Sequence, residues 1–114
     1  MIEFQKDGYI YQITFCFPDK KRKQKNQRHT LARLSVKIVN AENPEDYVWN
    51  KIRESLVSRD SRDILYDKHI GRKKAFALIL LDSFPLKSDK EFRTQLWKQF
   101  FKVYHNWYKY INID

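Results

Sequence analysis

Six cations occupy nine consecutive positions of this sequence, between two stretches that are rich in apolar residues. Binding of phosphate groups needs cations at high density, and each contact releases counterions from the polyanion. Like charges in such a run repel one another, so the sequence predicts a mobile, protruding basic loop over residues 18–29. A solvated hairpin tip that discourages aggregation is the alternative interpretation. The predicted phosphate-binding residues of this loop are Lys20, Lys21, Arg22, Lys23, Lys25 and Arg28.

Two further basic groups lie in predicted helices. Arg72, Lys73 and Lys74 follow a glycine at a helix start, where cations oppose the helix dipole but backbone N–H groups can bind an anion. Such a conflict between local stability and charge is typical of functional sites, although a tolerated surface run also explains it. A basic stripe on the last predicted helix, which is an ordinary feature of an amphipathic helix, comprises Lys98, Lys102, His105 and Lys109.

An aromatic strip lies beside the main apolar face of that last helix and makes its apolar arc unusually wide. Its members are Trp97, Phe101, Tyr104 and Tyr108. The strip can belong to the core, stack nucleic-acid bases or contact a protein partner. We expect core packing for Phe101, and we assign Trp97, Tyr104 and Tyr108 to a candidate partner interface, with Trp97 and Tyr108 partly exposed.

No set of residues forms a recognisable catalytic or metal-binding constellation. His29, His69 and His105 lack metal-ligand spacing, and a single cysteine cannot build a zinc site. The two glycines of the chain provide no phosphate-cradling loop. We therefore expect no catalytic residues, no metal and no cofactor, and we predict that the chain is not an enzyme.

One acidic cluster could in principle hold a divalent metal ion, as clusters of carboxylates do in nuclease sites. It comprises Asp60, Asp63 and Asp67. Three cations interleave with these acids, so local ion pairs are the preferred explanation. These cations are Arg59, Arg62 and Lys68.

The composition describes one small basic domain. The chain has 114 residues, of which 42% are hydrophobic, so residues 1–114 can form a single domain with its own core. The formal net charge of +9 favours polyanion partners, although it can also simply confer solubility. Cys16 lies in an apolar run, where we expect it to be buried. No apolar run is long enough to span a membrane, and we expect a protein of the host-cell cytoplasm with no membrane partner.

Periodicity predicts two strands at the beginning of the chain and a helix after them. Alternating apolar residues over 8–18 and 30–39 predict a long antiparallel hairpin. A helix is predicted over residues 44–58, because Asn43 can cap it and Pro44 suits its first position. Its apolar face would comprise Val48, Ile52 and Leu56.

Two more helices complete the prediction, over residues 70–81 and 89–110, with a loop between residues 59 and 69. Ser88 and Glu91 form a capping box for the last helix. The inward faces would comprise Ala75, Phe76, Leu78 and Ile79 on the first of them, and Phe92, Leu96, Phe100, Val103 and Trp107 on the second. The expected fold class is α+β, with a two-stranded antiparallel hairpin followed by three helices (ββααα) that pack on one face of it.

One segment resembles a pattern of many small, uncharacterised phage proteins. In that pattern an aromatic residue follows an acid, isoleucine-glycine-arginine-lysine opens an alanine-rich helix, and a later helix carries arginine, tryptophan and an aromatic pair. The matching residues are Asp63, Tyr66, Ile70-Gly71-Arg72-Lys73, Ala75, Leu78, Arg93, Leu96-Trp97 and Phe100-Phe101. The resemblance covers about a third of the chain. It implies a phage or prophage origin, and it implies no activity and no site residues.

These features support two functional hypotheses. In the first, the chain is a phage-type accessory protein that binds nucleic-acid phosphates with little sequence selectivity, because nothing in it specifies bases. In the second, it is a phage-encoded inhibitor of a host defence complex, of the anti-CRISPR type, that acts by protein contact at or near a nucleic-acid channel. The expected partner is accordingly nucleic acid or a host complex that handles nucleic acid. The roles themselves are taken by analogy with other small phage proteins.

Overall fold

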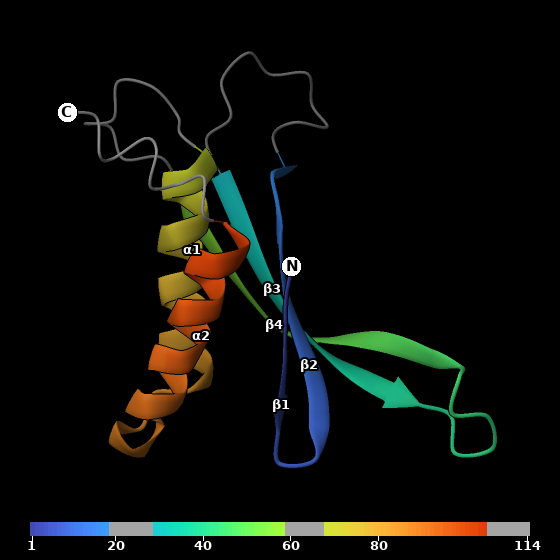
Figure 1. The fold of residues 1–114 in the computed structure, drawn as a ribbon. Helices are drawn as coiled ribbons and strands as arrows, with labels where there is room; N and C mark the ends of the chain where they lie inside the picture. Colours follow the sequence, from blue (N-terminus) through green and yellow to red (C-terminus); the bar gives the residue numbers. More distant parts are fainter. Residues whose placement is uncertain (19–28, 59–67, 105–114) are drawn as a thin grey trace.

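The computed structural model describes residues 1–18, 29–58 and 68–104. Four strands form one antiparallel sheet in the order β1-β2-β3-β4, and two helices cover one of its faces (Figure 1). The strands are β1 (Ile2–Lys6), β2 (Tyr9–Cys16), β3 (His29–Val39) and β4 (Tyr47–Ser58). The helices are α1 (Lys68–Ser83) and α2 (Lys90–Val103), with the short 3-10 helix η2 (Lys87–Asp89) before α2.

The prediction of a two-stranded hairpin followed by three helices is therefore wrong in two places. The predicted hairpin is present, since β2 and β3 pair antiparallel, and α1 and α2 occupy the positions of the second and third predicted helices. The predicted first helix is instead strand β4, and an additional strand, β1, precedes the hairpin. The class remains α+β, with two helices on a four-stranded sheet.

Strand β1 is joined to β2 by a two-residue turn that the sequence indicates locally. Lys6 pairs with Tyr9, and the two residues between them, Asp7 and Gly8, have φ angles of 53° and 83°. Positive φ at both central positions is the geometry that favours Asp-Gly in tight β-hairpins, because this turn matches the twist of the strands. The alternating residues Ile2 and Phe4 then face the helices and are buried.

Strand β4 corrects the helix predicted over residues 44–58. Asn43 and Pro44 begin a tight turn, in which the Asp46 amide donates to the Asn43 carbonyl at 2.9 Å. The Asn43 side chain stabilises this turn by donating to the Asp46 carboxylate at 3.1 Å. Proline suits the second position of such a turn as well as it suits the first turn of a helix. The three residues of the predicted apolar face lie exposed along the strand; they are Val48, Ile52 and Leu56.

The core lies between the sheet and the two helices, and its centre is aromatic. Phe76 of α1 and Phe100 of α2 are fully buried and stacked, with ring centroids 4.7 Å apart. Phe15 of β2 meets both rings edge-on. Most of the predicted inward residues are buried or pack against this core, including Ala75, Ile79, Leu96 and Phe92.

Several burial predictions are wrong. Leu78 and Val103 are each 42% exposed, and Leu80 is buried in place of Leu78. Cys16 is exposed, because it faces away from the helices on the alternating strand β2. Trp107 lies outside the described residues.

The connection between α1 and α2 also differs from the predicted capping box. Helix α2 follows η2 directly, and no side chain caps either of them. Arg93 stabilises this connection instead, since its guanidinium donates to the carbonyl groups of Phe84 and Leu86. The two helices run antiparallel, with the end of α2 beside the start of α1 (Figure 1).

Candidate nucleic-acid interface

The antiparallel helices bring two of the predicted basic groups to one end of the molecule. Along the helix pair, the Phe84 ring meets the Phe92 ring, Phe76 meets Phe100, and Arg72 meets Tyr104. The first turns of α1 and the last turns of α2 are therefore neighbours. We call this region the basic end, and its cations are Arg72, Lys73, Lys74, Lys98 and Lys102.

Strand β2 reaches the same end. The Arg72 guanidinium lies 5.5 Å from the centroid of the Phe17 ring, just beyond the last residue of β2. The described chain stops at Pro18 and resumes at His29, the first residue of β3. The segment that joins these two strands is the predicted basic loop, so the ends of that segment are attached at the basic end. Its six predicted phosphate-binding residues, and likewise Lys109, lie outside the described residues.

Arg72 is packed against its own chain. Its guanidinium lies over the Tyr104 ring at 5.0 Å as well as over Phe17, and it is 3.1 Å from Nδ1 of His69. Contacts between a guanidinium and aromatic faces are favourable and preserve the positive charge. Arg72 thus packs against the aromatic residues at this end of the core, and these contacts hold its positive charge in a fixed position at the basic end.

Tyr104 connects the end of α2 to the beginning of the chain. The Met1 amino group donates to the Tyr104 hydroxyl at 2.8 Å. Burial raises the pKa of the Tyr104 phenol, and the nearby Arg72 charge opposes this effect in part. Burial lowers the pKa of the Met1 amino group, and here the Arg72 charge acts in the same direction.

The remaining cations of the basic end face solvent to different degrees. Lys74, Lys98 and Lys102 are exposed, whereas Lys73 is half-buried. The sequence of this region contains no acid, since neither residues 69–81 nor residues 92–104 include an Asp or Glu. The three acids of the helical layer are at the opposite end of the helix pair; they are Asp82, Asp89 and Glu91.

The candidate partner interface lies beside these cations. Trp97 is half-buried. The centroid of its ring lies 4.7 Å from that of the Phe76 ring, which it meets edge-on, and 5.6 Å from that of the Phe101 ring, on which it stacks. Tyr104 is half-buried against Phe100 and Phe15. The rings of both residues therefore pack against the core and are still partly accessible at the surface, and Tyr108 lies outside the described residues.

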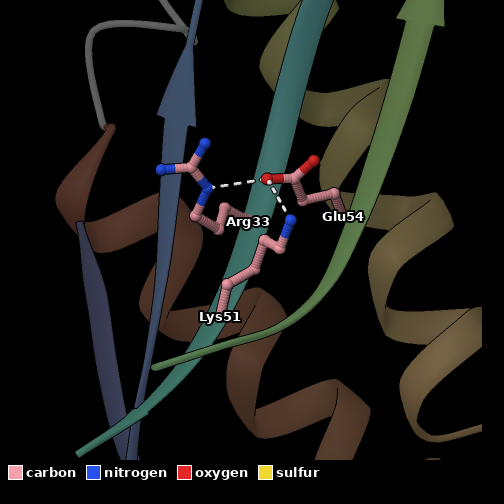
Figure 2. A network of polar contacts seen from close by, with 3 residues as sticks. All are labelled: Arg33, Lys51 and Glu54. Carbon is pink, nitrogen blue, oxygen red and sulfur yellow. Dashed lines mark hydrogen bonds and ion pairs between the residues drawn. The ribbon is translucent and has the colours of Figure 1, made fainter. Parts of the chain in front are cut away.

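The sheet face opposite the helices carries a polar network that the sequence analysis missed. Glu54 of β4 accepts from Arg33 Nε at 2.9 Å and lies 3.6 Å from the Lys51 ammonium, both through Oε1 (Figure 2). Further along this face, the Lys37 ammonium lies 4.0 Å from the centroid of the Tyr47 ring. Recognising β4 as a strand, from its aromatic and β-branched residues, would have placed these residues together.

The described residues contain neither a metal-binding cluster nor a helix that could span a membrane. No group of three or more His, Cys, Asp or Glu side chains in residues 1–18, 29–58 and 68–104 is arranged to hold a metal ion. The acidic cluster of Asp60, Asp63 and Asp67 lies outside these ranges. Neither helix of the described part has the length and apolar character needed to cross a membrane.

Comparisons of the chain with protein-family models, with curated proteins and with solved structures gave no match.

Proposed function

We propose that this chain binds nucleic acid through the phosphate backbone, with the basic end as its contact surface. The observation that carries the proposal is the convergence of separate basic segments. The start of α1, the end of α2 and the attachment points of the 19–28 segment lie together, although up to about 80 residues separate them in sequence. Clustered cations attract a polyanion more strongly than the same charges dispersed over a surface.

The distribution of charge between the layers supports the same surface. Residues 68–104, which contain both helices, include nine Lys and Arg but three Asp and Glu. The described sheet residues, 1–18 and 29–58, include five Lys and Arg and six Asp and Glu. The positive field of the described chain therefore comes from the helical layer, and within that layer the acids are absent from the basic end.

The residues of the basic end have different roles in this proposal. The exposed side chains of Lys74, Lys98 and Lys102 contact phosphates, and the cations of the 19–28 segment add further contacts. Arg72 and Tyr104 hold the surface in place through their mutual packing. Contacts of this kind position a backbone and do not distinguish bases, so binding has little sequence selectivity.

The test compares two double variants, one near the end of α2 and one at η2 and the first residue of α2. Lys98→Ala with Lys102→Ala removes two cations at the basic end, whereas Lys87→Ala with Lys90→Ala removes two exposed cations at the other end. Affinity for a labelled DNA duplex is measured by fluorescence anisotropy over a series of salt concentrations. We expect the first variant to reduce the slope of log affinity against log salt by about two units, and the second to leave it unchanged.

The 19–28 segment has a corresponding test. Replacing Lys20, Lys21, Arg22 and Lys23 by Ala should reduce the same slope by up to about four units, one for each phosphate group that is no longer bound. Equal slopes for the wild type and for both basic-end variants would contradict the proposal. Equal reductions of this slope in the Lys98→Ala/Lys102→Ala variant and in the Lys87→Ala/Lys90→Ala variant would show attraction by net charge alone.

A second candidate function, inhibition of a host complex that handles nucleic acid, is favoured by the far end of the β3–β4 hairpin. This end projects from the body of the molecule (Figure 1), and Ile38 and Val39 are each more than 40% exposed there. Its turn carries Glu42, Glu45 and Asp46 and no cation, which suits a basic protein surface. A pull-down from host lysate with and without nuclease distinguishes the two functions, because a protein partner that survives nuclease supports inhibition.

A further inference from the structure

Strand β4 is a long edge strand. It has 12 residues, and in the described sheet it pairs with β3 on one side only. The outward N–H and C=O groups of such a strand form a template for another strand. Helix α1 covers one face of β4, where the Asp82 carboxylate accepts from the Ser55 hydroxyl at 3.2 Å, and among the described residues no strand pairs with the outer edge of β4.

Strand β4 also exposes several large apolar side chains. Tyr47, Val48, Ile52 and Leu56 are between 48% and 61% exposed. Natural edge strands are usually protected by charges, prolines or short length. The exposed apolar surface of β4 is typical of a strand that is covered by a partner.

The β-bulge in β4 sets which of its side chains share a face. Lys51 lies opposite Ser35 and Glu54 lies opposite Arg33, so both project from the sheet face that the helices leave open. Three positions separate Lys51 from Glu54, and they share this face because Ile52 is an extra residue at the irregularity. Their ion pair at 3.6 Å agrees with this placement (Figure 2).

We propose that two copies of this chain pair antiparallel through the outer edges of β4 and form a dimer with an eight-stranded sheet. One register matches both charge and apolar character. It places Lys51 opposite Glu54 of the second copy, Trp49 opposite Leu56 and Val48 opposite Val57. Both charge pairs occur, because a two-fold axis repeats every contact.

The bulge is compatible with this register. The two-fold axis passes between Ile52 and Arg53, so the irregular part of each strand faces its own symmetry mate. The regular halves, residues 47–51 and 54–58, then pair with each other. Glu54 can meet the second Lys51 through Oε2, because its contacts within one chain are both made by Oε1. The dimer is independent of the proposed nucleic-acid binding, since β4 contributes no residue to the basic end.

The experiment is a charge exchange followed by sedimentation equilibrium on nuclease-treated protein. Lys51→Glu places like charges opposite one another across the axis, and so does Glu54→Lys. We expect each variant alone to dimerise at least about tenfold more weakly than the wild type. Mixed in equal amounts, the two variants should associate as a heterodimer with near wild-type affinity, because both facing pairs are then of opposite charge.

Two controls make the result decisive. Glu3→Lys reverses an exposed charge on β1, at the opposite edge of the described sheet from β4, and should leave the dimer unchanged. Leu56→Lys leaves the Arg33–Glu54–Lys51 network intact and should weaken the dimer on its own, which decides the matter if a charge variant fails to fold. The proposal is overturned by a wild-type chain that stays monomeric at concentrations of about 200 μM. It is also overturned if the mixed variants fail to associate or if Leu56→Lys has no effect.

Discussion

Arg72 shows how a single side chain can match a motif and have a second role in the fold. The sequence places it among three consecutive cations at a helix start, which predicts phosphate binding. In the structure its guanidinium lies between the rings of Phe17 and Tyr104. Because α1 begins at Lys68 and not at Ile70, Arg72 lies beyond the first turn, and the two rings provide favourable contacts for its charge.

Phe100 is the residue whose loss we expect to be most costly. It is 1% exposed and stacks on Phe76, and Phe15, Trp97, Phe101 and Tyr104 surround it. Phe100→Ala should lower the free energy of unfolding by about 3–5 kcal/mol, because it leaves a cavity between rigid rings. Urea denaturation measures this change, with Val103→Ala on the same helix as a control that costs less than about 1 kcal/mol. Similar midpoints for the two variants would contradict the described packing of α2.

Tyr104 makes stability depend on pH in the alkaline range. The pKa of the phenol is raised above its usual value of 10.0 in the folded chain, mainly by burial. Between the unfolded and the folded pKa, the folded state binds more protons, so stability falls as pH rises through this interval. The contribution is complete below pH 10. Thermal melts between pH 8.5 and 11 should show a smaller loss of stability for Tyr104→Phe than for the wild type, and parallel curves would argue against a buried phenol.

At the scale of elements, β4 shows that one sequence can satisfy two periods. Val48, Ile52 and Leu56 are four residues apart, which fits one face of a helix. The same stretch contains Tyr47, Trp49 and other residues that favour strands. Residues 47–58 form a strand because they pair with β3 along its whole length. Without this pairing, the β3 backbone would present an unpaired edge.

The β1–β2 turn provides a test of the additional strand. Gly8 has a φ of 83°, and a Cβ atom built there has no heavy atom within 4 Å. Gly8→Ala should therefore destabilise the chain by about 1 kcal/mol through backbone strain alone, without a steric clash. Gly8→Asn should cost less, since asparagine tolerates this conformation. Denaturant melts measure the loss of unfolding free energy in each variant. Equal losses for Gly8→Ala and Gly8→Asn would mean that the turn is of another type.

At the scale of the molecule, acidic and basic residues are separated along its length. Strand β3 begins at the basic end, and its 11 residues lead to the acidic turn of residues 40–46. A strand of this length spans about 33 Å, several Debye lengths at physiological salt. The acids of that turn therefore have little influence on an anion bound at the basic end.

Neutralising the acidic turn tests this separation. Glu42→Gln, Glu45→Gln and Asp46→Asn together raise the net charge by three without changing the basic end. We expect the affinity for duplex DNA at 0.15 M salt to change by less than about twofold, because the charges are screened over this distance. A large increase in affinity would place the nucleic acid on the sheet or on the hairpin instead of on the helical layer.

The sequence alone determined the features that depend on residues close to one another along the chain. The alternation over β2 and β3, the helical period of α1 and α2, and the burial of Phe76, Leu96 and Phe100 follow from local periodicity, and all are present in the structure. The Asp-Gly turn is equally local, whereas strand β1 was not predicted, because its five residues form too short a run for a clear period.

Only the tertiary structure decided the remaining features, because they depend on contacts between segments that are distant in sequence. The identity of β4 depends on a partner strand, and the packing of Arg72 depends on the rings of Phe17 and Tyr104, which follow the last residues of β2 and α2. The convergence of Lys74, Lys98 and the ends of the 19–28 segment depends on the antiparallel arrangement of the helices over the sheet. Charge can be counted in a sequence, but its density at one surface is set by how the elements pack.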